Sequence, residues 1–206
     1  MIGAKSIENV FDRRRRRAAK HDAMLMVASD LFNKKGYAAT SLDEVASRLN
    51  ITKTALYYYV RNKPTLLSEC YERTLDVCEA TMGRCEGMDA DGLTRIRTYF
   101  RSMISGLAEF GPIAVVHEFD ILPENTRKQI HTRARGLDRR LEAFIRLGID
   151  DGSVRPMPSK AVEMLLMGAN NWIQRWYRED GRLNLDEIAD LFLNLFTEGL
   201  AAGPNQ

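Results

Sequence analysis

Apolar residues recur every three or four positions along most of the chain, the spacing that places them on one face of an α-helix. The pattern is clear in the series Leu93, Ile96, Phe100, Met103, Ile104 and Leu107, and it returns in a long segment after Pro123. We find no stretch in which apolar and polar residues alternate as in a half-buried strand. The pattern therefore predicts an all-α protein.

The first helix is predicted to begin at Ala18 and to end at Gly36, after two lysines in its last turn. Cationic side chains beside the last carbonyl groups, followed by a glycine, are typical of a helix C-terminus. Residues 1–17 show no helical spacing and include the run Arg13 to Arg17. Because a block of like charges repels itself, we expect these residues to form a mobile arm or a frayed first turn.

Two short helices joined by a tight turn come next. Ser41 and Glu44 have the spacing of a capping box, which opens the first helix, and Thr52 caps the second, which extends to about Val60. Asn50 lies in the turn because asparagine tolerates a left-handed backbone. This is a helix-turn-helix arrangement, whose second helix fits the major groove of DNA. A plain three-helix bundle would show the same pattern.

Charge is divided unevenly along the chain, although the net charge is only +2. Residues 1–64 hold 13 of the 30 Lys and Arg and 6 of the 28 Asp and Glu, a balance of +7. The remainder holds 17 bases and 22 acids, a balance of −5. Such asymmetry points to contact of the basic part with nucleic acid or a membrane surface.

Several classes of protein are excluded by what the sequence lacks. No apolar run approaches the roughly 18 residues of a membrane-spanning helix, and the first residues lack the features of a secretory signal. The three cysteines match no zinc or redox spacing. The common nucleophile, phosphate-loop, dinucleotide and zinc-protease motifs are absent. We expect a cytoplasmic protein that is not an enzyme and has no catalytic residues, metal or cofactor.

The helix-turn-helix supplies candidate DNA contacts of two kinds. Thr40 and Ser41, where its first helix starts, offer hydroxyl groups and free amides to phosphate oxygens, and Lys63 is placed to hold a flanking phosphate. The candidates for the groove itself lie on exposed positions of the second helix and are Lys53, Thr54, Tyr57 and Tyr58.

Four segments of this region resemble the DNA-binding domain of the tetracycline-repressor (TetR) family. They are Ala28–Tyr37 (ASDLFNKKGY), Thr40–Ala46 (TSLDEVA), Ile51–Val60 (ITKTALYYYV) and Asn62–Leu67 (NKPTLL). The resemblance spans about forty residues and places Lys53, Thr54, Tyr57, Tyr58 and Tyr59 at or beside the groove, with Lys63 on a backbone phosphate. Three positions depart from the family pattern, Tyr59 for a frequent His, Val60 for Phe and Thr54 for Gly, so base preferences do not carry over.

The resemblance implies a homodimer that binds a palindromic operator and is released by a small ligand. It divides the chain into the arm 1–17, the helix-turn-helix domain 18–64, and a ligand-binding and dimerisation domain of about six helices, 65–206. A helical ligand-binding protein, or an architectural DNA-binding protein without effector coupling, is the alternative.

The last two predicted helices carry broad apolar faces that could pair across a two-fold axis into a four-helix bundle. The candidate dimer residues are Leu165, Ala169, Ile173, Leu185, Ile188, Phe192, Leu195 and Phe196. About half of these residues are expected to belong instead to the core of the single chain.

Candidate walls of a ligand pocket are the aromatic residues and methionines of the second domain, although such residues are more often plain core. They are Phe100, Met103, Ile104, Phe110, His117, Met164, Met167, Trp172, Arg175 and Trp176. The segment from Asn170 to Arg178 resembles the penultimate helix of regulators that respond to acyl-CoA thioesters. Arg175 beside Trp172 could meet a phosphate and an adenine face. The expected effector is hydrophobic, acyl-CoA or lipid-like, and the alternative is an interface helix with a solvated arginine.

The run Arg13 to Arg17 has two interpretations. It could follow the DNA backbone or enter the minor groove, as arms of other helix-turn-helix proteins do. Otherwise it is a solvated cluster that adds nonspecific attraction.

Overall fold

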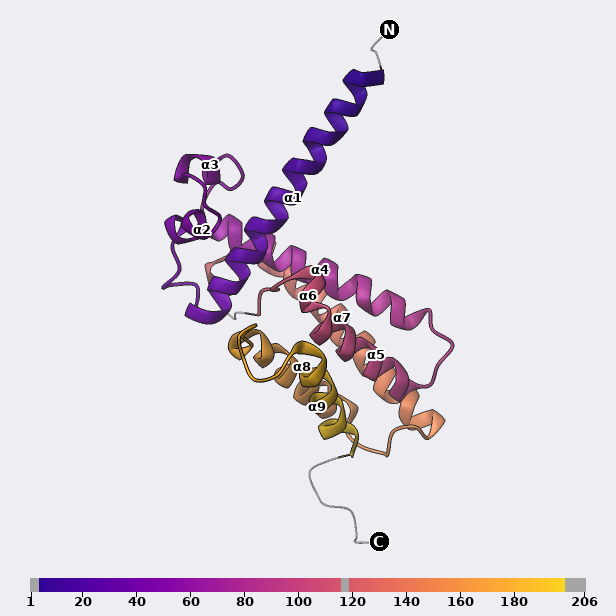
Figure 1. Cartoon of the computed structure of the whole chain (residues 1–206). Coiled ribbons are helices and arrows are strands. Elements are labelled where there is room, and N and C mark those ends of the chain that lie inside the picture. Colours follow the sequence, from indigo (N-terminus) through magenta and orange to yellow (C-terminus); the bar gives the residue numbers. More distant parts are fainter. Residues whose placement is uncertain (1–3, 116–118, 199–206) are drawn as a thin grey trace. The chain divides into compact units, whose positions relative to one another are not determined.

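The computed structural model describes residues 4–115 and 119–198 (Figure 1). Every regular element in these ranges is helical, as predicted. The elements are α1 (Ala4–Lys35), α2 (Leu42–Arg48), α3 (Lys53–Tyr57), α4 (Lys63–Glu86), α5 (Gly92–Ser105), α6 (Leu107–Phe110), the short 3-10 turn η1 (Phe119–Ile121), α7 (Glu124–Asp151), α8 (Ser159–Trp176) and α9 (Leu185–Glu198).

The chain divides into two compact units. The first contains residues 1–73 and 112–123, and the second contains residues 74–111 and 124–206. The division therefore falls inside α4, whereas the sequence placed a boundary between residues 64 and 65, at the start of this helix. A continuous helix offers no composition break at which such a division could be found in the sequence.

Helix α1 is longer than predicted, because it begins at Ala4 and not at Ala18. The arginine run is thus part of a helix, which corrects the expectation of an irregular arm. Arginine is among the better helix formers, and no proline or glycine interrupts the 32 residues of α1. The sequence prediction relied on apolar spacing, which an exposed helix does not need.

The predicted helix ends in the helix-turn-helix are confirmed, with one exception. Gly36 and Asn50 have positive φ, 81° and 52°, after α1 and α2. Ser41 and Thr52 accept hydrogen bonds from the third amide of α2 and α3, respectively. However, α3 ends at Tyr57 and not near Val60. Aromatic and β-branched side chains lose rotamer freedom in a helix, which favours an early end in this segment.

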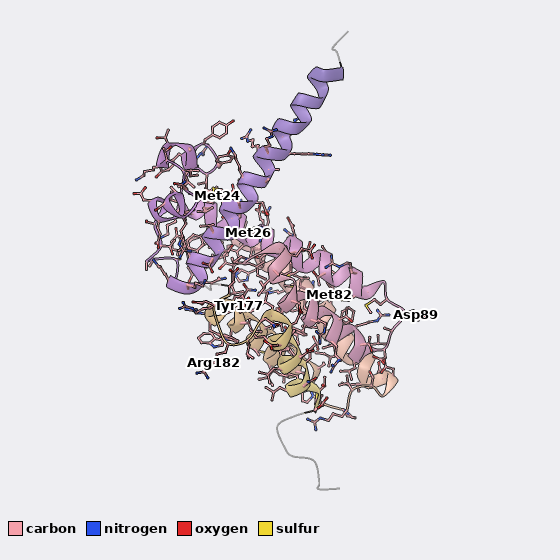
Figure 2. The ribbon with its side chains drawn as sticks, in the orientation of Figure 1. Met24, Met26, Met82, Asp89, Tyr177 and Arg182 are labelled. Carbon is pink, nitrogen blue, oxygen red and sulfur yellow. The ribbon has the colours of Figure 1, made fainter. Side chains whose placement is uncertain are left out.

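Each unit has its own apolar core. Met24 of α1 is buried in the first unit and Met82 of α4 in the second (Figure 2). In the second unit α5 packs against α7, α8 and α9. Gly92 at the start of α5 approaches the backbone of α7 so closely that a Cβ there would lie 2.1 Å from the amide nitrogen of Gly148.

Candidate nucleic-acid interface

Helix α3 is capped at its first turn and joined to α2 by an ion pair. The Thr52 hydroxyl accepts a hydrogen bond from the Ala55 amide at 3.2 Å. The Lys53 ammonium donates to the Asp43 carboxylate of α2 at 2.9 Å, and this hydrogen bond raises the pKa of Lys53. The first contact fixes the start of α3 and the second joins α3 to α2, so the outward side chains of α3 are presented in a defined direction.

The structure brings the predicted groove residues together on the outside of α3. Lys53, Thr54, Tyr57 and Tyr58 are all exposed, and of the two tyrosines Tyr58 is the more exposed, at 66%. Tyr59 is half-buried, and its ring meets the edge of the Tyr58 ring at 5.3 Å between centroids. These residues provide hydroxyl groups, one ammonium and aromatic surface, which suit base edges and thymine methyl groups.

The predicted phosphate contacts differ in their availability. Ser41 is exposed, but Thr40 is only 2% exposed and its hydroxyl donates to the Gly36 carbonyl at 2.9 Å. The side chain of Thr40 therefore closes the turn between α1 and α2, and cannot reach a phosphate in this conformation. Lys63 is half-buried over the Tyr37 ring at 4.1 Å, and this burial lowers its pKa.

The predicted ligand residues are not brought together within one chain. On α5, Phe100, Met103 and Ile104 are buried, and the Phe100 ring packs on Phe192 of α9 at 5.4 Å. The predicted residues that are exposed on α8 are Met164, Trp172, Arg175 and Trp176, whereas Met167 and Phe110 are half-buried and His117 lies outside the described residues.

The predicted ligand residues of α8 are exposed because of the orientation of this helix. Its buried side carries Glu163, Leu166, Asn170, Ile173 and Gln174, a largely polar series that a search for apolar walls does not select. The adjacency predicted for Arg175 and Trp172 is confirmed, with the guanidinium carbon 5.4 Å from the ring centroid. It lies on the outward side of the helix.

The predicted dimer residues also separate into two groups. Ile173, Leu185, Ile188 and Phe192 are buried within the chain, whereas Leu165, Leu195 and Phe196 are exposed and Ala169 is half-buried. The expectation that about half belong to the core of the single chain is thus confirmed.

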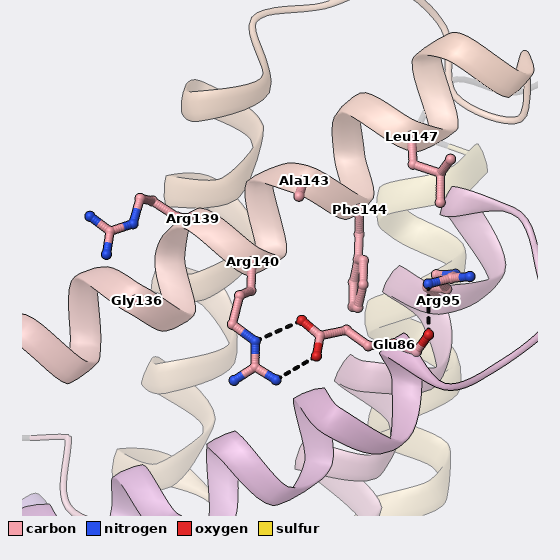
Figure 3. Close-up of a pocket in the computed structure, with 8 residues that line it drawn as sticks. All are labelled: Glu86, Arg95, Gly136, Arg139, Arg140, Ala143, Phe144 and Leu147. Atoms are coloured by element: carbon pink, nitrogen blue, oxygen red, sulfur yellow. Dashed lines mark hydrogen bonds and ion pairs between the residues drawn. The ribbon is translucent and has the colours of Figure 1, made fainter.

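A pocket of about 520 Å³ in the second unit was missed by the sequence analysis (Figure 3). Its lining comes from α4, α5 and α7: Glu86, Arg95, Gly136, Arg139, Arg140, Ala143, Phe144 and Leu147. Arg140 donates two hydrogen bonds to Glu86, both at 2.7 Å, and they lower the pKa of Glu86. Three guanidinium groups against one carboxylate leave the lining net positive, beside the apolar surface of Phe144 and Leu147. The arginines of α7 are the sequence signal that could have pointed to this pocket.

Within residues 4–115 and 119–198, no group of three or more His, Cys, Asp or Glu side chains is arranged to hold a metal ion. None of the helices in these ranges combines the length and the apolar character that crossing a membrane requires.

Comparison with known proteins agrees with this architecture. The family model for bacterial regulatory proteins of the tetR family matches residues 25–70, and the model for the tetracyclin repressor-like C-terminal domain matches residues 89–200. The HTH-type transcriptional repressor KstR2 of Rhodococcus jostii (strain RHA1) is 24% identical over 199 residues, which cover 92% of this chain and 95% of the relative.

Solved structures give the same result. The TetR family transcriptional regulator PfmR from Thermus thermophilus is 25% identical with a TM-score of 0.71, over 87% of this chain and 99% of that one. AibR in complex with isovaleryl coenzyme A and operator DNA is 27% identical with a TM-score of 0.69, over 86% and 98%. The matched family consists of regulators, which confirms that the chain is not an enzyme. With a capped helix-turn-helix in one unit and an all-α second unit matched by its own model, this chain belongs to the TetR family of DNA-binding transcriptional regulators.

Proposed function

We propose that the chain is a homodimeric repressor that binds a palindromic operator and is released by a small, acyl-CoA-like effector. The observation that carries the DNA-binding role is the exposed side of α3, where Lys53, Thr54, Tyr57 and Tyr58 project from a helix fixed to α2. In a major groove these side chains read base edges, and Ser41 at the start of α2 holds a phosphate.

Three residues act around this reading surface. Tyr59 supports Tyr58 through their edge-on ring contact. Thr40 positions the loop before α2 through its bond to Gly36. Lys63 lies against the same loop, with its ammonium 3.3 Å from the Ala38 carbonyl, and exchanges this contact for a flanking phosphate when DNA binds.

A second copy of this chain is the proposed partner of the outward side of α8 and α9. Seven large apolar side chains are exposed there: Met164, Leu165, Trp172, Trp176, Leu191, Leu195 and Phe196. Both helices pack on α5, so this apolar surface belongs to one rigid unit. A cluster of exposed large apolar side chains marks an interaction surface, and a two-fold axis through it makes a four-helix bundle. Arg175, stacked on Trp172, lies in this interface and not in a ligand pocket.

The chemical class of the proposed effector is supported by AibR, whose structure holds isovaleryl coenzyme A together with operator DNA. In this chain the pocket between α4, α5 and α7 combines Arg95, Arg139 and Arg140 with Phe144 and Leu147. Guanidinium groups bind phosphates through paired N–H donors, and the apolar residues suit an uncharged part of the same ligand. An anion with an apolar tail, such as an acyl-CoA thioester, fits this lining.

Selection of duplexes from a random DNA library by the purified chain tests the proposal. We expect one near-palindromic sequence to be enriched, to bind with a Kd in the nanomolar range, and to be released by isovaleryl-CoA or a longer acyl-CoA but not by coenzyme A alone. Tyr58→Ala should weaken binding to the enriched duplex much more than binding to random DNA, and equal losses would contradict its role in reading bases. Release by none of the thioesters would favour a DNA-binding protein without this effector.

A further inference from the structure

The N-terminal part of α1 is a charged surface that the proposed function does not use. Helix α1 continues without interruption from the core of the first unit to Ala4. All side chains from Arg14 to Lys20 are exposed. The helix propensity of arginine favours this conformation, but the exposed side chains from Arg14 to Lys20 gain little from packing within the first unit.

Helical geometry divides these arginines between different faces. Successive residues are rotated by about 100°, so Arg14, Arg17 and His21 continue the line of Met24 and Ala28, which are buried in the first unit. Arg15 is rotated by about 160° from Arg17 and lies on the opposite face. Arg14 and Arg15 are therefore alike in charge and exposure, and they differ mainly in the direction in which their side chains leave the helix.

The face that carries Arg17 lies beside α3. The guanidinium carbon of Arg17 is 5.0 Å from the centroid of the Tyr58 ring, and His21, one turn further along, faces the Tyr59 ring at 6.5 Å. The more exposed of the two tyrosines of the reading surface is thus in contact with the basic extension of α1. DNA that receives Tyr58 in its groove must pass close to this face.

The positive charges elsewhere in the first unit are largely compensated. Lys34 pairs with Asp30, Lys35 with Glu44, and Lys53 with Asp43. Arg14 and Lys20, in contrast, form no ion pair with any side chain that the structure describes. Exposed cations available to phosphate therefore lie on the extension of α1, with Arg61 as a further exposed cation outside it.

We propose that the N-terminal extension of α1 is a second DNA-binding surface, in which Arg14 and Arg17 bind backbone phosphates beside the groove occupied by α3. The stack on Tyr58 holds the Arg17 guanidinium in place while its N–H donors remain available to a phosphate. This contact rests on the proposed function, since it requires α3 to enter the groove. It adds no base recognition, because phosphates carry no sequence information.

The test compares Arg14→Gln with the matched control Arg15→Gln, which removes the same charge one residue away and on another face. The affinity of each chain for the duplex enriched by the unaltered chain is measured by fluorescence anisotropy at a series of salt concentrations. Each phosphate contact contributes about 0.9 to the slope of log affinity against log salt, so the slope of an Arg14→Gln dimer should fall by roughly 1.8. The slope measured for Arg15→Gln should equal that of the unaltered chain. Shortening the duplex at both flanks should weaken the unaltered chain more than it weakens Arg14→Gln, which has already lost one of the two proposed contacts.

Equal slopes for all three chains would overturn the proposal, as would equal reductions for Arg14→Gln and Arg15→Gln, which would indicate diffuse attraction. Circular dichroism should show the same helical content for all three chains, which excludes unfolding of the extension as the cause of a changed slope. If the unaltered chain enriches no duplex, the proposed function itself fails, and this result is distinct from a failure of the α1 contact alone.

Discussion

Asn33 joins two segments of the first unit that are 80 residues apart in the sequence. Its amide nitrogen donates to the Ile113 carbonyl at 2.6 Å, and its amide oxygen accepts from the Val115 amide at 2.9 Å. The side chain is completely buried near the end of α1. Asn33 thus satisfies two backbone groups of the segment that connects α6 and α7, and we expect it to hold this segment in place.

Replacing Asn33 by Ala removes both hydrogen bonds. The Ile113 carbonyl and the Val115 amide then lose their hydrogen-bond partner. Each buried group left unsatisfied costs about 1–3 kcal/mol. The Ile113 residue is buried and Val115 only half-buried, so the upper part of the range applies to the first group and the lower part to the second. The expected loss in the free energy of unfolding is about 4 kcal/mol.

Urea unfolding monitored by circular dichroism measures this loss, and hydrogen exchange at the Val115 amide localises it. The amide should exchange faster in Asn33→Ala by a factor of ten or more, which corresponds to about 1.4 kcal/mol of local protection. Asn194→Ala, at an exposed position of α9, is the control and should change neither quantity by more than about 0.5 kcal/mol. A variant of Asn33 with unchanged stability and unchanged exchange at Val115 would refute the reasoning.

Three further predictions concern the second unit and a buried thiol. Gly92→Ala should destabilise the chain by several kcal/mol, because the new methyl group meets backbone atoms at Gly148 that cannot move aside. Gly136→Ala, with open space around it, should be neutral or stabilising by up to about 1 kcal/mol, and a similar thermal shift for both would contradict this. Burial raises the pKa of Cys70 from 9.0 to about 12. Iodoacetamide at mildly alkaline pH should therefore label it only after unfolding, and the free energy of unfolding should fall between pH 9.0 and about 12, where only the unfolded chain ionises this thiol. Leu165→Arg places a charge on the exposed side of α8 and should convert the dimer to monomers in sedimentation experiments, whereas an unchanged dimer would exclude this surface as the interface.

Local signals account for what the sequence predicted well. Ser41, Asn50 and Thr52 determine helix ends through interactions within four residues, and such interactions are visible in a short stretch of sequence. The extension of α1 was missed because it depends on helix propensity and not on an apolar stripe. The contacts of Asn33 were missed because they link segments that are distant in the chain, and polar type alone does not reveal a buried position.

Helix α8 shows the limit of sequence prediction most clearly. Its exposed side carries large apolar residues, whereas three of its five buried residues, Glu163, Asn170 and Gln174, are polar. Glu163 is buried there and pairs with Lys160 at 2.5 Å, which offsets part of the cost of removing a carboxylate from water. Trp172 is 60% exposed on the opposite side. Pattern analysis assumes that apolar residues face the core of the same chain, and this assumption fails where a second chain supplies the core. The reversed polarity of α8 is therefore itself an argument that its outward side is covered in the working protein, since leaving such side chains in water forfeits about 25 cal/mol for each Å² that a partner would bury.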